Sequence, residues 1–383
     1  MSTTVFRVGN GRDARPGGAD LPAVKKVLFV AGGLCDDSIC HSVLRLAREL
    51  KRRGCEVTLV CGGGPLAPEL ARASIPTVVL SRLATSRHPL FVPRALLDQV
   101  RTLQPDVLHF FGRSLARLAA RVADATGKPY VLTVTTFAPP GSAGRIPGKW
   151  KRGAVMAVSE ELREELVNQA RIPKDAIGVI PIGIALEDYE RYRATNERPS
   201  IPIVGTVGPL TPERGGEYFL LAAKEILDQG HDVQFLIAGD GPERFPLRRQ
   251  IHKLGIDKWV TVAEAFSDYR RMIAILDICV IPAVREGLGL DVLEAMACRK
   301  PVVATGAGPA FSLISDGETG LLAPKKDPAA IAEKVIRLLR EPELASRLVE
   351  AAYAMVRERF SVEATAEALL VFYARRIQRA EAS

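Results

Sequence analysis

Short apolar runs alternate along the chain with longer segments in which apolar residues recur every three or four positions. The first run, residues 26–31 (KVLFVA), is apolar after its first residue, as in a parallel strand buried on both faces. Two glycines follow, and residues 41–53 then place Leu44, Ala47 and Leu50 on one face of a predicted helix. This succession of strand, turn and helix predicts an α/β fold.

The same succession continues to about residue 185 and starts again near residue 202. In the first half we predict strands at 26–31, 55–61, 106–110, 130–134 and 154–158, and helices at 41–53, 114–126 and 160–169, the last capped by Ser159. In the second half we predict strands at 203–207, 234–238, 259–262, 278–281 and 301–304, helices at 217–229 and 290–298, and nearly continuous helix from residue 328. Such alternation indicates doubly wound parallel sheets.

The chain is too long for one hydrophobic core, because single cores rarely grow beyond about 250–300 residues. Residues 186–201 are charged and lack apolar periodicity, which indicates a linker between two domains. We therefore expect two Rossmann-like domains facing a cleft. The predicted boundaries are a disordered lead-in at 1–22, domains at 23–185 and 202–360, and a final helix at 361–383 that crosses back to the first domain.

The net charge of +8 is unevenly distributed. Through residue 185 there are 26 Lys and Arg against 15 Asp and Glu, whereas the rest of the chain has 26 against 29. A basic first half suits an anionic partner such as lipid headgroups, phosphorylated acceptors or nucleic acid, and it equally suits a solvated basic surface. We expect no nucleic-acid partner, and any membrane contact to be peripheral and electrostatic, at the inner face.

Other features of the composition favour a cytoplasmic globular protein. No run approaches the roughly 18 apolar residues of a membrane-spanning helix, and the N-terminus lacks a signal-peptide pattern. The six cysteines form no C-x-x-C pair, so we interpret them as buried free thiols in a reducing compartment. Cys35 and Cys40 are expected in a loop, where redox activity is the alternative.

Two glycine-rich loops in the second half carry candidate chemistry. In EGLGLDVLE, residues 286–294, the glycines allow close backbone approach and the predicted helix offers its N-terminal amides to a diphosphate. Glu286 and Glu294 would accept hydrogen bonds from sugar hydroxyls, although spacing alone equally fits two solvated glutamates. The second loop contains Gly208 and leads to Arg214, which suits a phosphate or is an ordinary surface arginine.

The first half offers weaker candidates, and several known motifs are missing. Gly32 and Gly33 follow the first strand, and His109 ends another strand, as a ligand neighbour or a satisfied structural histidine. The chain contains no G-x-x-x-x-G-K-[ST] and no G-x-G-x-x-G after a strand. It also lacks a D-x-D pair, which disfavours a divalent metal held on a diphosphate by paired aspartates. We therefore predict neither a metal nor a cofactor.

The motifs together resemble the retaining family 4 glycosyltransferases, which have the GT-B fold. The resemblance covers about residues 26–375 and includes AVSEELREEL at 157–166, VIPIGI at 179–184, LIAGDGPER at 236–244 and EGLGLDVLEAMACRKPVVAT at 286–305. It implies a nucleotide-diphosphate sugar bound mainly by the second domain and an acceptor bound by the first. In this sequence, Glu294 would hold the ribose and Glu286 the donor sugar. The amides of Gly289 and Leu290 would meet the diphosphate or sugar, and Gly208 would line the phosphate pocket.

The sequence departs from this family at the expected site. The family usually grips the diphosphate with two cations, and this chain has lost one and changed the other. The departures are Pro209 for Arg, Arg214 for Lys, Thr135 for a His that contacts the donor sugar, Ile182 for Asn, and Ser312 for Glu. Losing one preorganised contact typically costs about 10²–10³ in rate, so the departures leave activity open.

The function expected from the resemblance is metal-independent transfer of a sugar, with retention, from a nucleotide-diphosphate donor to a saccharide, lipid or other small acceptor. Glu286 and Arg214 are the expected catalytic residues, and Gly32, Gly33, His109 and Thr135 are expected on the acceptor side of the cleft. The alternatives are a catalytically impaired relative with a regulatory or scaffolding role and a GT-B-like epimerase acting on a nucleotide-sugar.

Overall fold

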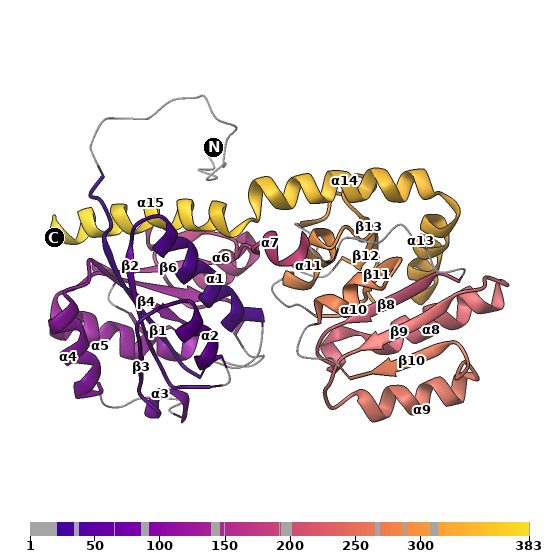
Figure 1. The fold of residues 1–383 in the computed structure, drawn as a ribbon, viewed down its shortest axis with the longest axis horizontal. Coiled ribbons are helices and arrows are strands. Elements are labelled where there is room, and N and C mark those ends of the chain that lie inside the picture. Colours follow the sequence, from indigo (N-terminus) through magenta and orange to yellow (C-terminus); the bar gives the residue numbers. More distant parts are fainter. Residues whose placement is uncertain are drawn as a thin grey trace. The chain divides into compact units, whose positions relative to one another are not determined.

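The computed structural model describes residues 21–33, 38–64, 66–85, 92–138, 146–148, 150–190, 192, 201–264, 269–285, 289–306 and 313–382. The chain forms two compact units, the first made of Met1–Gly183 with Val362–Ser383 and the second of Ile184–Ser361. Each unit contains one parallel sheet with helices against it (Figure 1). The α/β class and the two Rossmann-like units predicted from the sequence are confirmed.

The first unit is built on a seven-stranded sheet with the order β3-β2-β1-β4-β5-β6-β7, in which every pairing is parallel. Its strands are β1 (Lys26–Ala31), β2 (Glu56–Cys61), β3 (Thr77–Val79), β4 (Val107–Phe111), β5 (Tyr130–Val134), β6 (Gly153–Ala157) and β7 (Ile177–Val179). Its helices are α1 (Ser38–Arg52), α2 (Ala67–Arg72), α3 (Arg82–Thr85), α4 (Arg94–Leu103), η1 (Arg113–Leu115), α5 (Ala116–Thr126), α6 (Glu160–Asn168), η2 (Lys174–Ala176) and α15 (Val362–Glu381).

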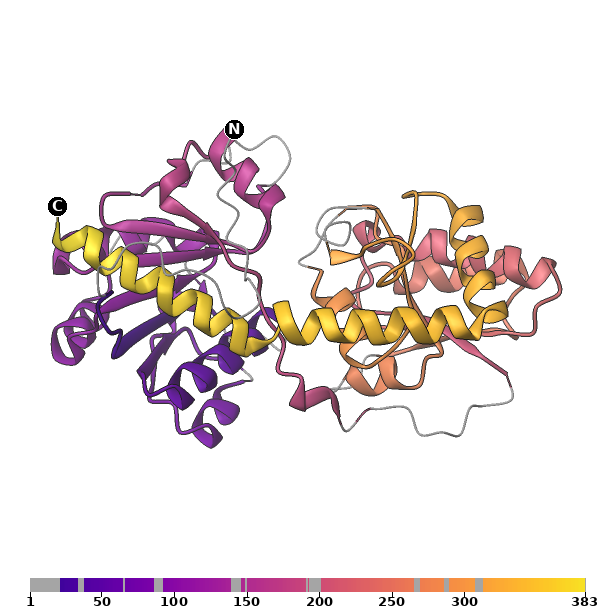
Figure 2. The ribbon, with the colours of Figure 1, turned by 90° about the horizontal axis from the view of Figure 1, so that it is seen from above.

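Strand β1 shows why its sequence is apolar at nearly every position. Successive side chains of a strand point to opposite faces of the sheet. Leu28 and Val30 pack in the core that contains α4, α5 and α6, whereas Phe29 packs in the core that contains α1 and α15. Because both faces are covered, both sets of side chains must be apolar. Figure 2 shows α15, in yellow, lying across the first unit.

The second unit has a six-stranded parallel sheet with the order β10-β9-β8-β11-β12-β13. Its strands are β8 (Ile203–Val207), β9 (Gln234–Ala238), β10 (Val260–Ala263), β11 (Ile278–Ile281), β12 (Val302–Thr305) and β13 (Leu321–Ala323). Its helices are α7 (Glu187–Glu190), η3 (Pro212–Arg214), α8 (Gly216–Asp228), α9 (Arg244–Leu254), α10 (Arg270–Ala274), α11 (Leu290–Ala297), α13 (Pro328–Arg340) and α14 (Pro342–Arg359).

Most predicted elements lie within one or two residues of their observed bounds, and the Ser159 hydroxyl caps α6 by accepting from the amide of Leu162 at 3.3 Å. Two expectations differ from the structure. Residues 187–190, predicted as linker, form α7 in the second unit. The reason is that the Tyr189 side chain is fully buried there, which fixes this segment to the unit. Cys40, predicted in a loop, is buried in α1, whereas Cys35 lies outside the described residues.

The described cysteines are Cys40, Cys55, Cys61, Cys279 and Cys298, and all five are buried free thiols. Burial raises the pKa of the Cys55, Cys61 and Cys279 thiols, which disfavours the reactive thiolate. These thiols therefore contribute to packing. Within the described ranges, no helix is both long enough and apolar enough to cross a membrane.

Candidate functional site

The first glycine loop of the second unit lies at the carboxyl end of β8. Gly208 has φ of 144°, which favours glycine, and its amide donates to the Ala238 carbonyl at 2.9 Å. A Cβ on Gly239 would overlap the Gly208 carbonyl oxygen, so the loops after β8 and β9 approach closely because both contain glycine. The Arg214 guanidinium lies about 4.0 Å from where a Cβ on Gly208 would be. This close packing of the loops brings the predicted phosphate loop and the predicted cation together.

Arg214 ends η3, and its placement depends on a second close approach. Gly215 has φ of 67°, and a Cβ there would overlap the carbonyl oxygen of Pro282, just after β11. The turn therefore brings Arg214 to the same edge of the sheet as α11. There its Nη1 atom forms an ion pair with Asp291 Oδ2, with 30% of the Arg214 side chain and 17% of the Asp291 side chain exposed. Asp291 is not among the site residues predicted from the sequence.

Helix α11 begins at this same edge. Gly289, with φ of 68°, precedes its first residue, Leu290, and as the N-cap residue it has no side chain to accept from the first amides. A helix N-terminus carries partial positive charge and free amides, which suit an anion. Gly208, Pro209, Arg214 and Asp291 line one small pocket of about 20 Å³ here. Glu286 lies outside the described residues.

Glu294 lies in the second turn of α11, and only 3% of it is exposed. Its Oε1 atom accepts a hydrogen bond from the Tyr189 hydroxyl at 3.1 Å and another from the Tyr269 hydroxyl. Arg270 pairs with Asp188 at 3.2 Å and lies over the Tyr189 ring at 5.7 Å. The carboxylate expected to hold a ribose is therefore already hydrogen bonded within the protein.

The contacts of Tyr189 and Tyr269 with Glu294 were not predicted from the sequence. Tyr189 lies in a stretch whose many charges indicated a linker, and Tyr269 precedes α10, a helix too short to show periodicity. A large aromatic residue within a charged stretch was the available signal at Tyr189, because such a residue usually needs burial.

The first unit has a larger pocket, of about 210 Å³, at the carboxyl ends of its strands. Gly32 and Gly33 line it together with Thr135, and Ile182 also contributes. The hydroxyl-bearing residues around it are Ser42, Ser114, Thr133, Thr135 and Thr365, and the other contributors are apolar side chains, glycines and Cys40. Among the described residues that line this pocket, none is charged.

His109 lies behind this pocket in β4 and has no exposed surface. One ring nitrogen is hydrogen bonded to the Tyr373 hydroxyl, and the other to Thr133 Oγ1 at 2.5 Å. Burial lowers the pKa of His109 to about 3, so the ring is neutral at physiological pH. This geometry is that of a satisfied structural histidine, which contacts the lining of the pocket through Thr133 and the stacked ring of Phe111.

Each half of the chain matches a known protein family. Residues 188–355 match the family model of glycosyl transferases group 1, and residues 41–188 match that of glycosyltransferase family 4. The two models together extend through both units. The chain is a family 4 glycosyltransferase.

Individual glycosyltransferases resemble the chain over much of its length. Alpha-D-kanosaminyltransferase of Streptomyces kanamyceticus is 34% identical over 233 residues, which cover 58% of this chain and 60% of that relative. A second relative is TuaC of Bacillus subtilis strain 168, named as a proposed teichuronic acid biosynthesis glycosyltransferase. It is 30% identical over 291 residues, which cover 70% of each chain. The structure of HepE from Anabaena in complex with UDP is 19% identical, covers 91% of this chain and 99% of its own, and has a TM-score of 0.75. The glycosyltransferase therefore has the GT-B fold.

Several predicted site residues of this glycosyltransferase lie together within each unit. Gly208, Arg214 and the start of α11 share one edge of the second sheet, and Gly32, Gly33 and Thr135 line one pocket of the first unit. Ser312 and Glu286 lie outside the described residues. No group of three or more His, Cys, Asp or Glu side chains that could hold a metal occurs among the described residues.

Proposed function

We propose that this glycosyltransferase transfers a sugar, with retention and without a metal, from a nucleoside-diphosphate donor to a saccharide, lipid or other small acceptor. The observation that supports the proposal is the convergence of Gly208, Arg214 and the first turn of α11 at one edge of the second sheet. A guanidinium, a glycine loop and helix amides together suit a diphosphate. The neutral, hydroxyl-lined pocket of the first unit suits an uncharged part of the acceptor.

In this proposal, Arg214 and the α11 amides stabilise the charge that develops on the leaving diphosphate. Glu294 accepts hydrogen bonds from the ribose hydroxyls after exchanging them for those of Tyr189 and Tyr269. Glu286 contacts the donor sugar. Because the positive charge comes from a side chain and from a helix end, leaving-group departure requires no divalent cation.

The test is release of nucleoside diphosphate from UDP-, GDP- and ADP-sugars, with and without saccharide and lipid acceptors. UDP-sugars come first, because HepE was solved with UDP, and amino-sugar donors are included because one relative is named a kanosaminyltransferase. We expect turnover to persist in excess chelator and the product to keep the donor's anomeric configuration by NMR. Nucleotide binding without transfer to any acceptor would instead favour the impaired relative, and epimerised donor would favour the epimerase.

We also propose that any membrane contact is peripheral, because the basic excess of the chain lies before residue 186. Each basic residue near an anionic surface contributes about 1 kcal/mol, and salt screens this attraction beyond roughly 10 Å at 0.1 M. Co-sedimentation with vesicles should therefore require anionic lipid and weaken with added salt. Binding to neutral vesicles at high salt would contradict the proposal.

A further inference from the structure

Asp291 lies where a phosphate group of the donor is expected. It is the second residue of α11, and its Oδ2 atom pairs with Nη1 of Arg214. Its Oδ1 atom accepts from the amide of Val292 at 3.1 Å. One carboxylate of the protein thus contacts both kinds of group that would bind a diphosphate, the guanidinium and an amide of the helix's first turn.

The ion pair also closes the space that a phosphate would need. The pocket lined by Gly208, Arg214 and Asp291 has a volume of about 20 Å³. One water molecule requires about 10–15 Å³ measured in this way, so the pocket holds about one water and no diphosphate. A ligand enters only if the Arg214 and Asp291 side chains separate.

The charges of the pocket lead to the same conclusion, that Arg214 is not available to a ligand. Among the described residues that line it, Arg214 is the one cation and Asp291 is the one anion, so their charges cancel. Pro209 supplies neither a charge nor an amide hydrogen. A diphosphate therefore meets a cation whose charge is already compensated, and it can contact the guanidinium only after Asp291 releases it.

We propose that Asp291 is an intramolecular competitor of the donor diphosphate, which holds Arg214 in the free protein and must release it for the donor to bind. This inference rests on the proposed function, since it assumes that Arg214 binds the donor. Its consequence is a donor affinity lower than Arg214 alone would give. It also favours ligands with several negative charges, because a weak anion does not displace a carboxylate already in contact.

The test is calorimetric titration of UDP, GDP, ADP and inorganic pyrophosphate into the full chain and its variants. Asp291→Asn keeps the shape of the side chain and removes its charge, so we expect about tenfold tighter nucleoside-diphosphate binding, which corresponds to about 1.4 kcal/mol. Asp291→Ser should act in the same direction. Arg214→Ala should weaken binding by about 10- to 100-fold, and adding Asp291→Asn to it should give a smaller gain than in the unsubstituted protein, because the competition for Arg214 is gone and only direct repulsion between the carboxylate and the ligand is relieved.

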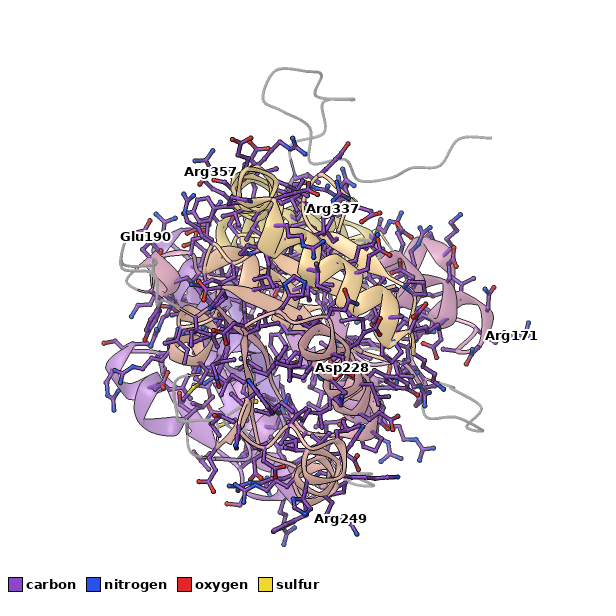
Figure 3. The ribbon with its side chains drawn as sticks, turned by 90° about the vertical axis from the view of Figure 1, so that its right-hand side faces the viewer. Arg171, Glu190, Asp228, Arg249, Arg337 and Arg357 are labelled. Carbon is purple, nitrogen blue, oxygen red and sulfur yellow. The ribbon has the colours of Figure 1, made fainter. Side chains whose placement is uncertain are left out.

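Asp228→Asn is the matched control. Asp228, which is labelled in Figure 3, lies on α8. It pairs with Lys224, has 61% of its side chain exposed and does not line this pocket, so its substitution removes the same charge from the same unit away from the site. It should leave the affinity unchanged, and thermal melting should show that every variant is folded.

The remaining outcomes separate the inference from the proposed function. If UDP or another nucleotide binds the unsubstituted protein and Asp291→Asn binds it equally or more weakly, the competition is refuted and the donor site stands. An equal gain in the Arg214→Ala background, or in Asp228→Asn, would also refute it, because the effect would then be one of general charge. If none of the nucleotides binds any form of the protein, the proposed donor site fails and the inference fails with it.

Discussion

The two pockets lie at equivalent edges of similar sheets, yet they differ in how far their polar groups are already satisfied. The pocket of the first unit, about 210 Å³, is lined by hydroxyls and apolar side chains, and its described lining has no charge. At the second unit's site, the charged groups contact one another, Arg214 with Asp291 and Glu294 with two tyrosines. A ligand can fill the first pocket, whereas at the second site it must exchange contacts.

Because of this difference, the free energy of donor binding and that of acceptor binding should respond differently to substitutions. Exchanging one hydrogen bond for another yields only a small net free energy, typically about 0.5–1.5 kcal/mol, although each bond alone is strong. Filling a preformed space displaces water but breaks no contact within the protein. We therefore expect substitutions at the second site to change donor affinity in either direction, and substitutions at the first pocket mainly to weaken acceptor binding.

The largest expected effect is that of Glu294→Gln. Glutamine still accepts the Tyr189 and Tyr269 hydroxyls, so stability should change little, but it loses the charge that strengthens hydrogen bonds to ribose hydroxyls. With two such bonds weakened, nucleoside-diphosphate affinity should fall by about 100-fold, measured by calorimetry. Glu333→Gln, an exposed change on α13, is the control. Unchanged affinity in a folded Glu294→Gln protein would remove Glu294 from the site.

The next effect tests the neutral pocket. Ser114 is exposed, follows β4 and lines the pocket, so a substitution there should not disturb the core. Ser114→Asp places a charge beside apolar groups and should raise the KM for an uncharged acceptor by about tenfold, with donor affinity unchanged. Ser114→Asn adds the same volume without the charge and should raise KM much less. Equal effects of the two variants would mean that volume, and not neutrality, determines acceptor binding.

A third prediction concerns the neutral ring behind this pocket. The folded pKa of His109 is about 3, below its ordinary value of 6.5, so the unfolded chain takes up a proton below pH 6.5 that the folded chain does not. This contribution to stability is complete above pH 6.5 and declines as the pH falls toward 3. Between pH 6 and 5 it should lower the unfolding free energy by about 1.2 kcal/mol, measured by urea titration.

His109→Gln should lack this part of the pH dependence, so the difference between the two proteins isolates it. NMR provides an independent readout if the variant folds poorly. The ring resonances of His109 in the unsubstituted protein should not shift between pH 7 and 5, and titration near 6.5 would show that the first pocket gains a charge.

The sequence revealed the repeated pattern of each unit well, because residues such as Leu28 and Phe29 are buried on opposite faces and every position of such a strand must be apolar. It missed β3, β7 and β13, which have three residues each, too few for a pattern. All three are edge strands and each carries at least one residue that is not buried, so the constraint on their composition is weaker.

The site was predictable where backbone geometry determines it and unpredictable where side chains meet across the fold. Gly208 and Gly289 both have positive φ, which a glycine in a strand-to-helix loop signals directly. The pair of Arg214 and Asp291 joins positions 77 residues apart, and no spacing rule relates them. The roles of Glu294 and Arg214 in donor binding stay predictions, and the internal partners of both are what the structure adds.

The smallest expected effect is that of Pro209→Arg, which returns the cation that the family usually has at this position. Pro209 lines the pocket of Arg214, and the amide of Leu210, the next residue, donates to the Asp240 carbonyl at 2.8 Å, so the loop should keep its path. A second cation makes the pocket positive, but it can also pair with Asp291. Part of the new attraction then goes to the carboxylate and only the rest to the donor. Donor affinity should therefore rise only about fivefold, and by more in the Asp291→Asn background, where no carboxylate competes. Pro209→Gln, a polar side chain without charge, is the control. If Pro209→Arg strengthened binding by the same factor with and without Asp291, the charges of this pocket would act independently, and Asp291 would not limit the access of a donor to its cations.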